Sequence, residues 1–187
     1  MRSVLPLFVA AIAASAPALA TEVVNVPAFR GVQIRGGGVV TVVPGSTQRV
    51  TIEEGSSQFT RMHVGYDGRL IIDTCNEQCP RFYRLRVVVQ SPDVPDLAIS
   101  GGGLITTAGG FRSQAQVSMA VNGGGRIDAR SVDAINVSAA VNGGGELLVR
   151  PRATLSAAVN GGGHVRYWGN PNVSMAVHGG GSVSPGS

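Results

Sequence analysis

The segment that decides the fold is VSAAVNGGG, residues 137–145, in which apolar side chains occupy every second position before an Asn and three glycines. Close copies recur along the chain, as VSMAVNGGG at 117–125, LSAAVNGGG at 155–163 and VSMAVHGGG at 173–181. Four such copies indicate an internal repeat, which is typical of serial β architectures in which each unit stacks on the one before it.

The glycine triplets mark the length of each repeat. They begin at Gly101, Gly123, Gly143, Gly161 and Gly179, so that the successive intervals are 22, 20, 18 and 18 residues. The period of two before each triplet predicts a strand with one buried face, and a second short alternating segment follows each triplet. A unit of strand, glycine corner, strand and return loop predicts an all-β fold, a single-stranded parallel β-helix (solenoid) of 18–22-residue repeats.

One other fold competes with this interpretation, and the spacing also allows a particular cross-section for the helix. An antiparallel β-meander is the alternative fold, because Asn-Gly favours tight hairpin turns. A register of six residues, running through Ile135, Val141, Leu147 and Ala153, would suit a triangular helix with three short faces per turn. Stacking explains better than hairpins why the copies recur in step, and we therefore predict the parallel helix.

One polar position repeats with the strands. Asn122, Asn142 and Asn160 precede successive triplets, and His178 replaces Asn in the last copy. Equivalent residues of stacked strands lie about 4.8 Å apart, which is close enough for their side-chain amides to form a hydrogen-bonded ladder. The three asparagines therefore predict a structural ladder.

The first half of the chain, residues 21–96, carries alternating apolar segments at looser spacing, such as 39–43 and 70–72. We expect this β-rich part to cap one end of the repeat array at 97–187, because the end of an open sheet needs cover. Since no linker-like stretch divides the halves, we predict one continuous domain over 21–187.

The N-terminus reads as a secretory signal peptide, residues 1–20. An apolar run over 4–16 is followed by small residues at Ala18 and Ala20, which suit a signal peptidase. We predict cleavage between Ala20 and Thr21 and export to the periplasm, the cell surface or the medium. Because no second long apolar stretch exists, we expect no membrane span in the mature chain.

Cys75 and Cys79 are the two cysteines of the chain. In an exported protein such a pair predicts a local disulfide. Two thiolates alone make an incomplete zinc site. We therefore expect no metal ion and no cofactor.

The charge pattern excludes several functional classes. The 15 cationic residues are all Arg, 11 residues are acidic, and the formal net charge is +4. No block of like charges with interleaved aromatic residues appears, so we expect no nucleic-acid partner. Eighteen of the 27 glycines come in six triplets, and no Gly-X-Y period appears, which excludes collagen.

The order of the motifs resembles a known bacterial family. FxxVxI at 29–34, DGxLxI at 67–72, VxVxxP at 87–92 and LxIxG at 97–101 are followed by the strand-Asn-Gly repeats. This order resembles the family called putative auto-transporter adhesin, head GIN domain. The resemblance spans nearly all of the mature chain and implies an exported β-helical protein of Gram-negative bacteria, with no catalytic residues to carry over.

We predict a non-enzymatic surface or periplasmic protein that binds a glycan or a protein through one face of the solenoid. Self-association through the solenoid ends would be a further interaction. The alternative is a β-helix-type carbohydrate-active enzyme acting on polysaccharide, which would need a carboxylate pair. Asp128 and Asp133, close to Arg126 and Arg130, are its best candidates, and ordinary surface ion pairs are the competing explanation for these four residues.

Overall fold

A computed structural model describes residues 21–76 and 78–187. All regular secondary structure in these residues is β-strand. The strands are β1 (Glu22–Val24), β2 (Gly31–Gly36), β3 (Val39–Pro44), β4 (Arg49–Glu54), β5 (Arg61–Val64), β6 (Arg69–Asp73), β7 (Arg86–Ser91), β8 (Asp96–Gly101), β9 (Leu104–Thr107), β10 (Gln114–Gly123), β11 (Arg126–Gly143), β12 (Glu146–Asn160), β13 (His164–Tyr167), β14 (Asn172–His178) and β15 (Ser182–Pro185). The predicted signal peptide, with its cleavage site after Ala20, lies outside the described residues.

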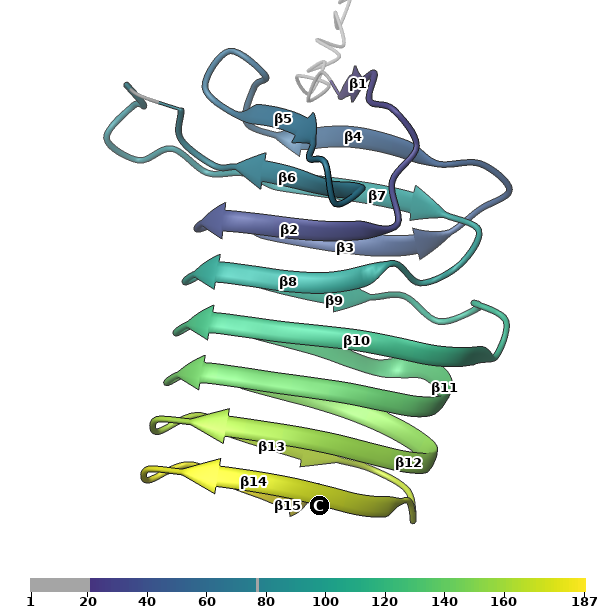
Figure 1. Ribbon diagram of the computed structural model, residues 1–187. Helices are drawn as coiled ribbons and strands as arrows, with labels where there is room; N and C mark the ends of the chain where they lie inside the picture. Colours follow the sequence, from purple (N-terminus) through teal and green to yellow (C-terminus); the bar gives the residue numbers. More distant parts are fainter. Residues whose placement is uncertain (1–20, 77) are drawn as a thin grey trace, which may run out of the picture.

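The strands form one strongly curled sheet that is mixed and largely parallel. In what we call the first row, β6, β2, β8, β10, the second half of β11, the second half of β12 and β14 pair in parallel. In the second row, β7, β3, β9, the first half of β11, the first half of β12, β13 and β15 do the same. Figure 1 shows the strands of the two rows lying one above another, from β2 and β3 down to β14 and β15.

Alternation within each repeat determines which side chains fill the space between the rows. In β11, Val137, Ala139 and Val141 are 3%, 2% and 0% exposed, whereas Ser138 and Asn142 point outward and are exposed. Because each repeat pairs with the next without a shift here, the same inward positions line up along the stack. The narrow core is therefore built mainly from Val, Ile, Leu and Ala, as the period of two predicts.

The pairing excludes two of the arrangements considered from the sequence. An antiparallel meander is wrong for the repeats, because β10, β11, β12 and β14 pair in parallel. The six-residue register is also wrong, since Ile135 is 43% exposed and Ala153 is exposed, although Val141 and Leu147 are buried. The strands form two rows, and a third buried face is absent from the part of the chain described.

The chain turns from the first row to the second at the glycine triplets. Gly143 has a φ of 118°, a left-handed conformation that suits glycine, and a Cβ built on it would lie 2.7 Å from the carbonyl oxygen of Gly123. The expected sharp glycine corner is therefore present, and the corners stack too closely for a side chain.

The two ends of the sheet differ. At the N-terminal end β5 pairs antiparallel with β6, β4 with β7, and β1 with β4, so that antiparallel strands cover both rows. At the C-terminal end β14 pairs with β12 alone and β15 with β13 alone. Within residues 21–76 and 78–187, the structure contains no helix that is long and apolar enough to cross a lipid bilayer.

Candidate functional site

A groove opens on the second row where the repeat length falls. In β11, Ala129 pairs with Val149 of β12 and Ala134 pairs with Pro151, so that residues 130–133 lie opposite Arg150 alone. The extra residues of the 20-residue repeat are accommodated in this bulge, where Arg130, Ser131 and Asp133 are exposed and Val132 packs in the core. The bulge and the shorter repeats beside it border an open hollow of about 670 Å³.

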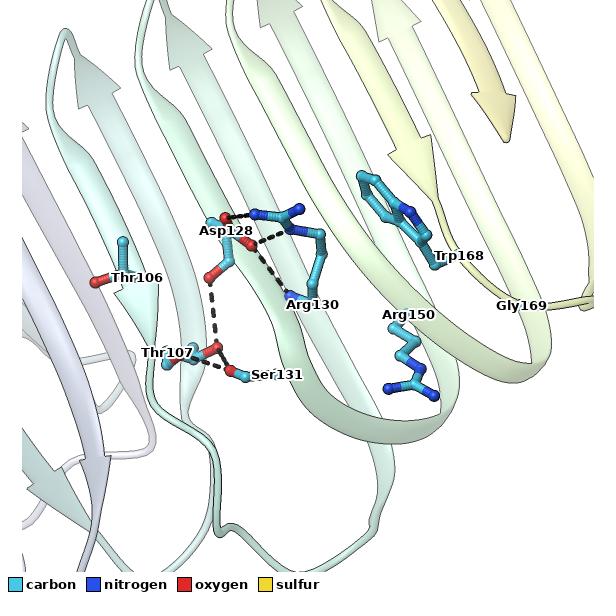
Figure 2. A pocket seen from close by; sticks show the side chains of 8 residues that line it. All are labelled: Thr106, Thr107, Asp128, Arg130, Ser131, Arg150, Trp168 and Gly169. Carbon is cyan, nitrogen blue, oxygen red and sulfur yellow. Dashed lines mark hydrogen bonds and ion pairs between the residues drawn. The ribbon is translucent and has the colours of Figure 1, made fainter. Parts of the chain in front are cut away.

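We call this hollow the Trp168 groove. It is lined by residues from four successive repeats, shown as sticks in Figure 2: Thr106, Thr107, Asp128, Arg130, Ser131, Arg150, Trp168 and Gly169.

An ion pair between Asp128 and Arg130 forms part of the groove wall. Arg130 donates from Nε to Oδ1 of Asp128 at 2.9 Å and from Nη2 to Oδ2 at 2.6 Å, which is the two-pronged geometry that guanidinium and carboxylate groups favour. The Arg130 backbone N–H also donates to Oδ1, at 3.3 Å. Three bonds therefore fix the Asp128 carboxylate.

These contacts set the charge state of both groups. The hydrogen bond from the Arg130 side chain is the main cause that lowers the pKa of Asp128; the Arg130 backbone N–H and the charges of Arg130 and Arg126 add to it, and burial opposes it. The same pairing raises the pKa of Arg130. Asp128 is therefore a carboxylate and Arg130 a cation at neutral pH.

Trp168 forms the opposite wall. It follows β13, and its backbone N–H donates to the carbonyl oxygen of Val149 at 3.0 Å. The Arg130 guanidinium carbon lies 5.0 Å from the centre of the indole ring, within the range of a cation–π contact. Gly186 packs against the same ring, because a Cβ on it would lie 2.2 Å from indole carbons. Figure 2 shows Arg130 between Asp128 and Trp168.

A small polar cluster closes the groove at the end away from Trp168. The hydroxyl groups of Thr107 and Ser131 are 2.8 Å apart, and Ser131 also donates to the Thr107 carbonyl oxygen. The Thr107 hydroxyl lies 3.4 Å from the Asp128 carbonyl oxygen. The cluster ties the bulge of β11 to β9, so the groove is held by side-chain contacts as well as by the strands.

The groove carries an excess of positive charge. Among its lining residues Asp128 pairs with Arg130, whereas Arg150 is exposed and has no ion-pair partner among the residues described. Two cations against one carboxylate leave a net charge of +1, calculated as +2 − 1. An arginine free to make paired hydrogen bonds can bind an anionic or hydroxyl-rich ligand.

The structure separates the four residues considered for catalysis. Asp128 and Arg130 lie in the groove, but Asp133 pairs with Arg152 at 3.2 Å and Arg126 pairs with Glu146. Each carboxylate is therefore neutralised by its own arginine. Asp128 and Asp133 are only five residues apart in the sequence. Because the bulge lies between them, their side chains pair with different arginines.

Four residues of the groove were not predicted from the sequence: Trp168, Arg150, Thr107 and Ser131. A signal for Trp168 was present, because it is the single Trp of the chain and directly follows a repeat strand. The fall in repeat length from 20 to 18 residues marked the place of the bulge. Neither signal identifies Arg130 as the partner of Trp168, which lies 38 residues further along the chain.

The other predicted site residues lie away from the groove. The disulfide between Cys75 and Cys79 is present, in the loop between β6 and β7. Asn122, Asn142 and Asn160 lie in register on the outer side of the first row. The Asn142 amide donates to Oδ1 of Asn122 at 2.9 Å, and the Asn160 amide donates to Oδ1 of Asn142 at 3.0 Å.

Comparison with known proteins identifies the family. The sequence matches the family model described as "Putative auto-transporter adhesin, head GIN domain" over residues 28–117 and 113–171. The chain belongs to this family. No curated protein sequence matches this head GIN domain chain.

Several solved structures resemble this head GIN domain protein. A putative adhesin from Bacteroides fragilis is 16% identical, with a TM-score of 0.56 over 91% of this chain and 98% of that chain. A putative lipid binding protein from Parabacteroides distasonis (15% identity, TM-score 0.39) covers 90% of this chain and 96% of its own. A putative adhesin from Parabacteroides merdae (15% identity, TM-score 0.44) covers the same shares. The Bacteroides fragilis structure supports the fold, which the two chains share at low identity.

Proposed function

We propose that this protein is an exported, non-enzymatic binding protein that holds an acidic glycan in the Trp168 groove. One hollow of about 670 Å³ contains the Trp168 indole ring, the Arg130–Asp128 ion pair and Arg150, which has no ion-pair partner in the described part of the chain, and this observation carries the proposal. The adhesin description of the family is consistent with such a role.

The chemistry of the lining residues favours a sugar that carries a carboxylate. Arg150 offers paired N–H donors to a carboxylate or sulfate group. The indole of Trp168 offers an apolar surface and one N–H donor, which suit the CH-rich side and the hydroxyl groups of a sugar ring. Asp128 retains lone pairs beyond those used by Arg130 and can accept from a hydroxyl group. The net charge of +1 disfavours a cationic ligand.

We further propose that the curled sheet is a parallel β-helix and that residues 21–187 form one continuous domain. The parallel pairing of each repeat with the next supports the first proposal, and a hydrophobic core cluster that runs from Phe29 to Val165 supports the second. Residues 21–96 would then cap the repeats at 97–187. The signal peptide expected at 1–20 and the family support export to the periplasm or the cell surface.

The geometry favours binding over polysaccharide cleavage. A general acid must hold a proton near neutral pH, which requires a raised pKa, whereas the Arg130 contact lowers the pKa of Asp128. Asp133, the other candidate carboxylate, is engaged by Arg152. Asp128 therefore lacks the raised pKa of a general acid, and the two carboxylates are held by different arginines instead of facing each other as a catalytic pair.

The single Trp of the chain makes the proposal directly testable by fluorescence. Trp168 emission is followed while the protein is titrated with a galacturonate oligosaccharide, and in parallel with the same oligosaccharide as its methyl ester. We expect a saturable change in emission with the acidic sugar, weakened about tenfold or more for the ester because the contact between Arg150 and a carboxylate is lost.

The matched variants are Arg150→Gln, in the groove, and Arg61→Gln, an exposed arginine of β5 at the other end of the sheet. We expect Arg150→Gln to weaken binding about tenfold and Arg61→Gln to leave it unchanged. Equal binding by both variants, or no saturable signal with acidic sugars of several linkages at millimolar concentration, would overturn the proposal.

A further inference from the structure

The last strand of the first row presents core residues to solvent. Val173, Met175 and Val177 of β14 occupy the inward positions that are buried in β11 and β12, yet they are 36%, 62% and 38% exposed. Every residue of β14 is exposed. The outer backbone edge of β14 has no strand partner among the described residues.

Natural sheets protect such an edge, and this one lacks the usual protection. Edge strands commonly carry charged side chains, prolines or bulges that prevent another strand from pairing. β14, with the sequence NVSMAVH, contains no charged residue of fixed sign, no proline and no register shift against β12. The opposite end of the sheet, by contrast, is covered by antiparallel strands.

The sequence of β14 is symmetric in chemical character about its middle residue. Met175 is flanked by the small residues Ser174 and Ala176, then by two valines, then by the polar Asn172 and His178. When a strand pairs antiparallel with its own copy, residues whose numbers add to a constant face each other. For a pair centred on Met175 that sum is 350, so apolar faces apolar, small faces small and polar faces polar.

We propose that β14 pairs antiparallel with β14 of a second copy of this chain, across a two-fold axis that passes through Met175. Val173 then faces the partner's Val177 on the inner side, and Asn172 faces the partner's His178 at each end. Such an isologous contact satisfies both backbone edges, continues the first row through the dimer and covers the exposed valines and methionine. No charged side chain of β14 or β15 opposes the approach of an identical surface.

The second row adds side-chain contacts but no strand pairing. β15 has four residues and ends at Pro185, which has no N–H to donate. The seven residues of β14 span about 23 Å, and two rows about 10 Å apart, with their outward side chains, make an end surface roughly 17–20 Å wide, so each copy buries on the order of 400 Å². This area is about half that of a standard interface, which predicts a reversible dimer that forms at micromolar or higher concentration.

Cysteine crosslinking tests the register at one residue. In the proposed dimer Met175 faces its own copy, with Cα atoms about 4.5–5.5 Å apart, which suits a disulfide. Ser174 faces Ala176 of the partner, so two copies of Ser174 are diagonal neighbours about 7–8 Å apart, beyond disulfide reach. Under mild oxidation at 100 µM we expect Met175→Cys to give a covalent dimer on a non-reducing gel, and Ser174→Cys to give at least tenfold less.

Sedimentation equilibrium of the otherwise unmodified chain supplies the second measurement. We expect a monomer–dimer equilibrium that Met175→Arg weakens about a hundredfold, because two like charges would meet at the axis in an apolar surround. Met175 is 62% exposed, so this change leaves the fold intact, which circular dichroism checks. A monomer at 500 µM would overturn the proposal, and equal crosslinking of the two cysteine variants would overturn the two-fold pairing centred on Met175.

Discussion

The three glycines of a triplet face different constraints. The first, such as Gly143, has a positive φ and stacks on the backbone of the preceding corner, whereas a Cβ on the middle glycine, Gly144, meets nothing within 4 Å. A Cβ on the third, Gly145, would lie 2.4 Å from a Val121 methyl group and 2.7 Å from the Gly125 carbonyl oxygen. The triplet therefore contains two positions that need glycine and one that tolerates a side chain.

We expect Gly143→Ala to lower the free energy of unfolding by about 3 kcal/mol, because backbone strain and the clash with the Gly123 carbonyl add together. Gly144→Ala is the matched control in the same corner, and its free energy of unfolding should be unchanged or raised by up to about 1 kcal/mol. Chemical denaturation followed by Trp168 fluorescence measures both. Equal losses at the two positions would contradict this account of the corner.

The Asp128–Arg130 pair predicts a pH-dependent contribution to stability. The folded protein lowers the pKa of Asp128, so the carboxylate stabilises the fold above its unfolded pKa of about 4, and the contribution is lost as the pH falls through and below that value. Asp128→Asn should therefore be less stable than the unmodified chain at pH 7 and at pH 5.5, with a difference that shrinks below about pH 4.

The control for that series is Asp133→Asn, which removes an exposed carboxylate from its pair with Arg152. We expect this change to alter the free energy of unfolding by less than about 1 kcal/mol at pH 7. Denaturant titrations between pH 3 and pH 7 compare the variants. A difference between Asp128→Asn and the unmodified chain that stays constant over this range would disprove the linkage to Asp128.

At the level of the strands, the asparagine ladder connects three repeats on the outer side of the first row. Asn142 takes part in two hydrogen bonds, one to Asn122 and one from Asn160, whereas each of these neighbours takes part in one bond of the ladder. A side chain in the middle of such a row should therefore matter more than one at its end.

We expect Asn142→Ala to lower the free energy of unfolding by about 1 kcal/mol, and Asn122→Ala by about half as much, since each exposed bond contributes modestly. Thermal unfolding of the two variants and of Asn122→Ala/Asn142→Ala tests the coupling. The double variant should lose little more than Asn142→Ala alone, because the bond between the two residues is already broken; fully additive losses would contradict the ladder.

The sequence determines the repeats better than it determines the groove. Alternation and the spacing of the triplets depend on local geometry, so the buried faces of β10, β11 and β12 and the in-register asparagines follow from the chain alone. The N-terminal antiparallel pairs were expected only as a β-rich cap, because their partners depend on contacts between distant segments.

The contact between Arg130 and Trp168 could not be derived in the same way. It joins residues 38 positions apart, and it exists because the bulge at 130–133 changes the register of one strand relative to the next. Repeat lengths locate such a bulge but do not give the direction of its side chains. Asp133 shows the difficulty, since it lies close to Asp128 in sequence and pairs with Arg152 on the next strand.

For the molecule as a whole, parallel pairing between neighbouring repeats makes stability a sum of adjacent contacts. β14 and β15 each pair with a single strand, and β14 is exposed along its whole length. The last repeat therefore contributes less to the fold than an internal one.

We expect a chain shortened by residues 172–187 to keep its β-sheet circular dichroism spectrum and a cooperative thermal transition, with a melting temperature lowered by about 5 °C. The emission of Trp168 should also change, because Gly186 no longer packs against its ring. Loss of a cooperative transition would show instead that the end of the sheet is required for folding.

The bulge opposite Arg150 is a part of the second row whose length can change without altering the paired strands on either side of it. Residues 130–133 pair with no strand of the row, and of these four only Val132 packs in the core. Insertions or deletions that keep Val132 in place would therefore alter the width of the groove while the glycine corners and the core columns keep their places. Related chains that differ in the length of this bulge would then bind different ligands. Ligand specificity in this family would then change faster during evolution than the fold does.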